Sequence, residues 1–208
     1  MGVGLHPWWV SRAVGSVPAE HAESLSTLVF QAVLAVRDER FVGEVGLDFS
    51  AAHAESRAQQ IEAFDAVIRS CAEHPVAGRV ISIHAVRAAG EALDVMQRYG
   101  LARQASCVFH WFSGTSDELA RARAMGCWFS MGERMLATRR GREYARQIPV
   151  ERLLIETDAP ALLDTAYSAE EWVASLSRTI EQLAQIHGCD QEELARTVTQ
   201  SSAVLLGL

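Results

Sequence analysis

Short apolar runs that alternate with stretches of helical spacing constrain this chain more than any other feature. The runs are bounded mostly by Gly, Pro, Ser or charged residues, which is typical of strands buried on both faces of a sheet. They occupy 41–48, 79–84, 106–110, 127–131 and 152–157, and residues 2–6 resemble the end of a further strand. Between them, apolar residues recur at intervals of three and four over 20–37, 55–73, 89–99, 169–187 and 190–206. Alternation of strand and helix predicts a parallel sheet.

The closed form of such a sheet is the (β/α)8 TIM-type barrel, which typically takes ~250 residues. This chain has 208 residues. We therefore expect a single α/β domain over 1–208 with the architecture of such a barrel that lacks its first two βα units. Unpaired sheet edges invite association, so we also expect a homo-oligomer or a partner segment that covers the open edges.

Composition excludes several classes of function. All 19 basic residues are arginine, which rules out Schiff-base chemistry and a phosphate-binding P-loop lysine. A formal charge of −7 argues against a protein that coats nucleic acid nonspecifically. It does not exclude a nuclease, because a bound cation can supply positive charge locally. Four scattered cysteines favour reduced thiols. The sequence has no apolar stretch of membrane-spanning length and no signal-peptide pattern, so we expect a cytoplasmic protein without a membrane partner.

Polar side chains gather where the predicted strands end. They are His6, Glu44 with Asp48, His84, His110, and Glu156 with Asp158. Chemistry in parallel α/β folds lies at the carboxyl ends of the strands, and a His, Glu and Asp set without thiolates suits Mg, Mn or Zn and hydrolysis. Each residue alone has an ordinary explanation, such as a hydrogen-bonded loop histidine or an ion pair between Glu44 and an arginine. The joint pattern favours a metal site.

Five segments carry a family resemblance. "GLHP", "GEVGLD", "ISIHAVRA", "VFHWFSG" and "LLIETDAP" resemble, in order and spacing, the motifs of the TatD family of metal-dependent deoxyribonucleases. The resemblance implies a barrel that holds divalent metal ions and cleaves phosphodiester bonds of DNA. It also implies roles for four residues: Glu44 bridges the metals, His84 and His110 hold one of them, and Asp158 lies at the other and helps to activate water. Glu44 and Asp158 are thus the expected catalytic residues.

Other residues are expected to bind substrate. Arg87 occupies a position suited to binding a phosphate oxygen. His6 lies at the same open end of the expected barrel, and Trp111 could stack on a base. The chain departs from the family by having no H-x-H pair, so weak or absent activity is expected. Two alternatives stay open: a catalytically impaired binding or interaction module on the same scaffold, and an amidohydrolase-type C–N hydrolase. Because the chain has no lysine to form a carboxylated bridge, phosphoester substrates are favoured over amides.

Overall fold

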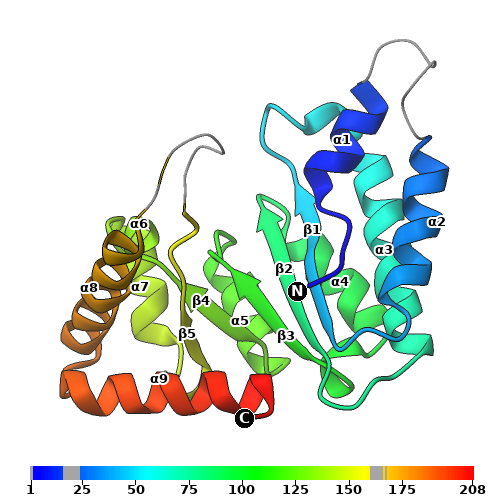
Figure 1. Ribbon diagram of the computed structural model, residues 1–208. Helices are drawn as coiled ribbons and strands as arrows, with labels where there is room; N and C mark the ends of the chain where they lie inside the picture. The colour runs from blue at the N-terminus through cyan, green and yellow to red at the C-terminus, as the bar shows by residue number, and fades with distance from the viewer. Residues whose placement is uncertain (1, 16–23, 160–165, 167) are drawn as a thin grey trace. The chain divides into compact units, whose positions relative to one another are not determined.

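The computed structural model describes residues 2–15, 24–159, 166 and 168–208 (Figure 1). The chain divides into two compact units, Met1–Cys127 and Trp128–Leu208, and each is considered by itself. The first four residues of the helix predicted over 20–37 lie outside the described part of the chain.

Unit 1 alternates parallel strands with helices. Its strands are β1 (Phe41–Asp48), β2 (Val80–Val86) and β3 (Ser106–His110); its helices are α1 (Pro7–Gly15), α2 (Leu25–Val36), α3 (Arg57–Glu73), α4 (Ala89–Arg98) and α5 (Ser116–Ala124), with short 3₁₀ turns at Ala54–Ser56 and Leu101–Arg103. β2 pairs in parallel with β1 and with β3, and His84 lies opposite Gly46 on one side and His110 on the other. The register therefore brings the ends of the three strands together.

The core of unit 1 lies where helices pack on this sheet. Leu47, Ile81, Ile83 and Phe109 alternate along the strands and are fully buried. α3 packs beside α2 and against β1, and α4 packs beside α3 (Figure 1). Burial of both faces of the strands explains why the apolar runs in the sequence are nearly continuous.

A buried arginine joins the carboxyl ends of α2 and α3 to the sheet. Arg79 is 1% exposed, directly before β2. Its guanidinium donates to the backbone carbonyls of Val36, Arg37, Glu39, Cys71 and His74, which lie at and just after the carboxyl ends of α2 and α3. Helix ends leave such carbonyls without intrahelical donors and carry partial negative charge. The guanidinium of Arg79 thus has its hydrogen-bond donors paired with carbonyl groups at the ends of these two helices.

Unit 2 continues the same alternation. It contains β4 (Trp128–Met131), α6 (Glu133–Leu136), α7 (Arg139–Gln147), a 3₁₀ turn (Val150–Arg152), β5 (Leu153–Ile155), α8 (Ala169–His187) and α9 (Gln191–Leu206). β4 and β5 pair in parallel, with Met131 opposite Ile155. A capping box of Ser168 and Glu171 starts α8, and left-handed Gly188 ends it, as the sequence pattern of these residue types would dictate.

The predicted strands over 41–48, 79–84, 106–110, 127–131 and 152–157 are all present, some with shifted ends. The strand expected over 2–6 reduces to a single parallel bridge between Val3 and Val42. α1 was not predicted from the sequence, although proline is favoured at a first helical position. Nor was α5, whose start is a capping box of Thr115 and Glu118. Within the described residues, no helix combines the length and apolar character that crossing a bilayer requires.

Candidate functional site

Glu44 lies on β1 where the strand approaches β2 closely. The pairing of β1 with β2 is irregular between Val42 and Val45, so Glu44 falls within the irregular stretch. Gly46 has a φ of 148°, and a Cβ there would overlap the carbonyl oxygen of His84. Only glycine tolerates both conditions. Gly46, the second glycine of "GEVGLD", is therefore a requirement of the close strand approach that brings Glu44 and His84 together.

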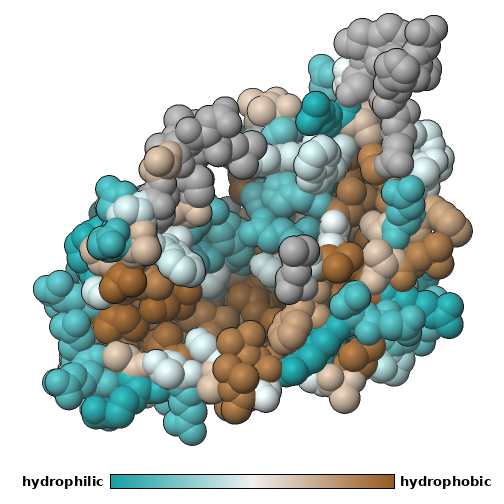
Figure 2. Space-filling model, in the orientation of Figure 1, coloured by the Kyte–Doolittle hydropathy of each residue, from teal (hydrophilic) through white to brown (hydrophobic). Residues whose placement is uncertain are grey.

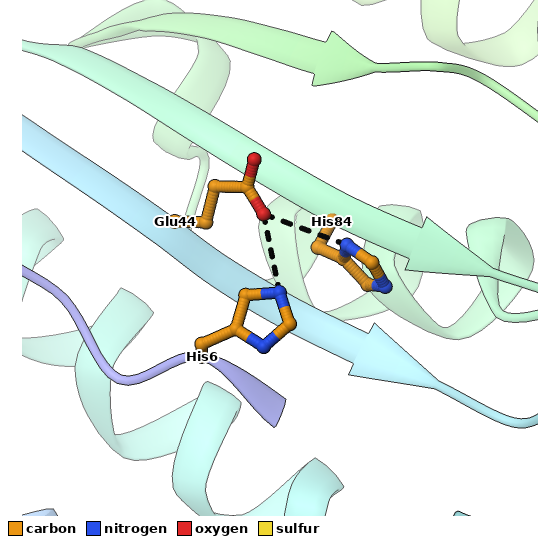
Figure 3. Close-up of side chains that lie close together, drawn as sticks. All are labelled: His6, Glu44 and His84. Atoms are coloured by element: carbon orange, nitrogen blue, oxygen red, sulfur yellow. Dashed lines mark ion pairs between the residues drawn. The ribbon is translucent and has the colours of Figure 1, made fainter. Parts of the chain in front are cut away.

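Three histidines surround the Glu44 carboxylate. Oε2 of Glu44 lies 3.2 Å from Nε2 of His6 and 3.5 Å from Nδ1 of His84 (Figure 3). One ligand atom each from His6, Glu44 and His84 lies within 4.8 Å of the ligand atoms of the other two residues. Nε2 of His110 lies 3.8 Å from the other carboxylate oxygen, and its ring stacks on that of His84 with centroids 6.2 Å apart. The strand ends thus bring together a nitrogen and oxygen set of the kind that binds divalent cations.

The environment keeps Glu44 ionised. Burial by itself would raise the pKa of this carboxyl group, because a charge loses solvation. Hydrogen bonding to His6 and His84 and the electrostatic interaction with His110 and His84 outweigh burial, and together they hold the pKa of Glu44 well below its usual range. The side chain is therefore a carboxylate, the form that ligates metals.

His84 is placed between two carboxylates. Its Nδ1 faces Glu44, while its Nε2 lies 3.4 Å from Oδ2 of Asp48. A neutral imidazole carries one N–H and can donate to only one of these partners. The nitrogen that faces the other carboxylate then needs a cation in front of it or a second proton. When Nε2–H donates to Asp48, the Nδ1 lone pair is directed to the Glu44 side, which is the arrangement of a metal-binding histidine with its supporting carboxylate.

His6 has the opposite arrangement of hydrogen bonds. Its Nδ1 accepts from the backbone N–H of Trp8 at 3.2 Å. In the neutral ring the proton then resides on Nε2, the atom that faces Glu44. This tautomer makes His6 a hydrogen-bond donor to Glu44. A ligand role through Nε2 would require the other tautomer and the loss of the bond from Trp8.

Asp48 and Trp8 support the site; the sequence placed Asp48 among the polar residues at strand ends but assigned a role to neither residue. Asp48 is buried and accepts from the indole Nε1–H of Trp8 at 2.7 Å and from the backbone N–H of Ser50 at 2.9 Å. Burial raises the pKa of Asp48, but these hydrogen bonds and the electrostatic interaction with His84 lower it by more, so it is held below its usual value. The available signal was the position of Asp48 at the carboxyl end of a strand.

Two of the residues that are expected to bind substrate come immediately after strands of unit 1. Arg87 comes one residue after β2 and Trp111 one residue after β3. Both have left-handed backbone, with φ of 54° and 40°. Such conformations cost about 1–3 kcal/mol in a residue other than glycine and are concentrated at functional sites. Arg87 is exposed and Trp111 is partly buried.

Asp158 lies in unit 2, three residues after β5, and also has left-handed backbone, with a φ of 50°. Its carboxylate lies 3.9 Å from the guanidinium of Arg134. The preceding residues are fixed by side chains from other elements: Ser130 of β4 donates to Glu156, and the indole of Trp172 on α8 donates to Thr157 at 2.9 Å. The "ETD" segment is thus anchored just before Asp158. Convergence of Glu44, His84, His110 and Asp158 on a shared cation stays a prediction.

Comparison with known sequences identifies relatives over most of the chain. A 3'-5' ssDNA/RNA exonuclease TatD from Pantoea vagans is 32% identical over 207 residues, which cover 94% of this chain and 78% of the relative. Deoxyribonuclease TATDN3 of Homo sapiens is 25% identical, over 98% of this chain and 72% of that protein. These names support the expected enzyme class, a nuclease that hydrolyses phosphodiester bonds.

Solved structures share the fold. YJJV, a TatD homologue from Escherichia coli, matches with a TM-score of 0.71 and 22% identity over 100% of this chain and 76% of that one. A TatD-family hydrolase from Entamoeba histolytica matches with a TM-score of 0.73 and 17% identity, covering 98% of this chain and 73% of its own. These matches confirm the expected α/β class of the TIM-type barrel. The profile of the family described as TatD related DNase matches residues 1–207, and the chain therefore belongs to that family.

Proposed function

We propose that this chain is a metal-dependent nuclease that hydrolyses phosphodiester bonds in DNA, with Glu44, His84, His110 and Asp158 as metal ligands and with Glu44 and Asp158 in the catalytic step. The observation that carries the proposal is the position of His84 between Glu44 and Asp48, which leaves one nitrogen directed to a carboxylate and in need of a positive partner. Two imidazole nitrogens beside a carboxylate favour Mn or Zn over Mg, which prefers an all-oxygen shell.

The chemistry divides between the cation and the side chains. A divalent cation, when bound, polarises the phosphate and lowers the pKa of a water molecule. Asp158 would accept the proton of the water that attacks phosphorus, while the bond from phosphorus to the departing sugar oxygen breaks. Nε2–H of His6 would exchange its bond to Glu44 for one to a phosphate oxygen and hold that oxygen in the site. Arg87 would neutralise a second phosphate oxygen, and Trp111 would stack on a base, which is worth ~1–3 kcal/mol.

A metal-binding and activity assay on Glu44→Gln tests the proposal. Glutamine keeps the shape but removes the charge, so we expect Mn²⁺ affinity measured by calorimetry to fall at least about tenfold and hydrolysis to fall about a hundredfold or more. Glu91→Gln on α4, an exposed residue in the first turn of that helix, is the matched control and should change neither. Wild-type hydrolysis that persists in excess chelator, or equal behaviour of the two variants, would refute the metal mechanism.

His6→Gln separates a donor from a ligand. Because glutamine also carries an N–H donor but cannot ligate as imidazole does, a donor role predicts unchanged Mn²⁺ affinity, partial retention of turnover in His6→Gln and a larger loss in His6→Ala. General acid–base or donor contributions of this kind are typically ~10²-fold or more. A tenfold loss of Mn²⁺ affinity in both variants would instead assign His6 to the metal.

The substrate is proposed to be single-stranded DNA that is degraded from its 3' end, since relatives carry the name 3'-5' ssDNA/RNA exonuclease. The assay uses an oligonucleotide labelled at its 5' end, offered single-stranded and as a blunt duplex. Progressive shortening of the single strand, with slower attack on the duplex, is the expected result. Cleavage at internal positions first, or no hydrolysis of either form with Mn²⁺ or Zn²⁺, would contradict it, the second outcome favouring a binding module.

A further inference from the structure

Helix α2 carries large apolar side chains on its exposed side. No charged residue occurs between Leu25 and Val36, and the polar residues of the helix are few. Phe30 is 63% exposed and Leu34 is 52% exposed. Figure 2 shows apolar side chains on the part of unit 1 where α2 lies, at the right of the view. Exposure of large apolar side chains next to one another marks a surface that binds something.

A groove runs beside Phe30, between α2 and α3. It has a volume of about 470 Å³ and is lined on the α2 side by Val29 and Val33 and on the α3 side by Ala63 and Ala66. The alanines are small and leave room in the groove, while Phe30, which also lines it, is largely exposed. One surface thus offers both a protruding aromatic ring and a hollow of a size to take one.

Charge is arranged along the groove in a self-complementary way. Glu62 and Arg69 both line it, both are exposed, and Ala66 lies between them on α3. Seven residues correspond to two helical turns, or about 10.5 Å along the axis. A twofold axis that crosses α3 near Ala66 at right angles would set Glu62 of one copy against Arg69 of the other, and the reverse pair on the opposite side. Twofold interfaces need this kind of reciprocal match.

We propose that this groove is the interface of a homodimer, in which the Phe30 side chain of each copy enters the groove of the other and two Glu62–Arg69 pairs flank the contact. The occupant is a second copy because the same patch supplies the ring, the hollow and both signs of charge. An unrelated helical partner would need only an apolar stripe and would leave the paired spacing of Glu62 and Arg69 without a purpose.

Sedimentation equilibrium of the whole chain over a range of concentrations measures the proposed association. We expect a reversible dimer for the wild type and, for Phe30→Glu, a dissociation constant raised at least about thirtyfold, because the variant puts a charge where an aromatic ring is buried. Val204→Glu is the matched control: Val204 is 65% exposed on α9 and does not line this groove, and its variant should dimerise like the wild type.

Charge reversal tests the geometry independently of apolar burial. Glu62→Arg alone and Arg69→Glu alone should each weaken the dimer about tenfold, because like charges then meet across the axis. The double variant E62R/R69E restores opposite pairs and should return the constant to within about threefold of the wild type. A wild type that remains monomeric at all concentrations overturns the proposal. So does a dimer that Phe30→Glu leaves intact, or a double variant no stronger than the single ones.

Discussion

Nε2 of His84 lies 3.4 Å from Oδ2 of Asp48, on the far side of the ring from Glu44. Asp48 is in turn held by the indole of Trp8 and by the backbone of Ser50. A carboxylate behind a histidine fixes the ring orientation and leaves the other nitrogen unprotonated toward a metal. The tautomer of His84 therefore depends on a residue that has no direct role as a ligand.

Replacing Asp48 by asparagine should weaken metal binding without removing a ligand. The amide retains much of the shape but loses the negative charge behind His84, so we expect Mn²⁺ affinity to fall roughly 10–100-fold. Calorimetric titration measures it, with Asp38→Asn, an exposed aspartate outside the site, as the control. An affinity within about threefold of the wild type would mean that Asp48 does not orient His84.

Arg79→Met should destabilise unit 1 strongly. The variant leaves five buried or partly buried carbonyls without their donor. Removing one partner of a buried charged network costs about 3–5 kcal/mol. Urea unfolding followed by circular dichroism measures the change, and Arg79→Lys should lie between, because an ammonium offers only three donors. Arg196→Met, at an exposed position of α9, should cost less than about 0.5 kcal/mol. Equal midpoints for the two methionine variants would contradict this account.

Gly46→Ala should disturb the site and stability together. The added Cβ meets the His84 carbonyl at a backbone conformation that side chains rarely adopt, so β1 and β2 must separate. We expect a loss of about 3 kcal/mol or more and reduced metal affinity. Gly15→Ala is the control, since Gly15 is the last residue of α1 and a Cβ there has open space. An unfolding midpoint for Gly46→Ala at the wild-type value would show that the strand approach is looser than described.

Stability of unit 2 should depend on pH through Glu133. The bidentate bond from Arg178, and the bond from Ser175, lower the pKa of Glu133 below 4.5, so the contribution is complete above about pH 4.5 and is lost as pH falls through the lowered folded-state value. Glu133→Gln should cost about 1 kcal/mol at pH 7, given partial exposure, and nothing at low pH. Glu192→Gln, from an exposed pair with Arg196, should cost little at either pH. A constant difference across this range would contradict the assignment.

Local patterns along the chain were sufficient for the strands of the sheet and for most of the candidate site. Strands buried on both faces leave unbroken apolar runs, so β1 and β3 could be predicted to the residue. Strand ends meet at one edge of a parallel sheet, so Glu44, His84 and His110 could be predicted as neighbours. α1 could not be found in this way, because "PWWVSRAVG" has no clear apolar period and follows what was read as a strand.

The sequence by itself determined which histidine and carboxylate side chains are candidates for the chemistry, because residue type and position at a strand end are both local properties. Only the tertiary structure decided how protons are distributed among them. His6 and His84 are the same residue type on one carboxylate, yet the backbone N–H of Trp8 makes one a donor and Asp48 directs the lone pair of the other. Such a difference arises from neighbours brought close by folding, and no spacing along the chain encodes it. The exposure of α2 was likewise decided only by the tertiary structure, since a helical pattern in the sequence predicts an apolar surface but does not predict which residues cover it.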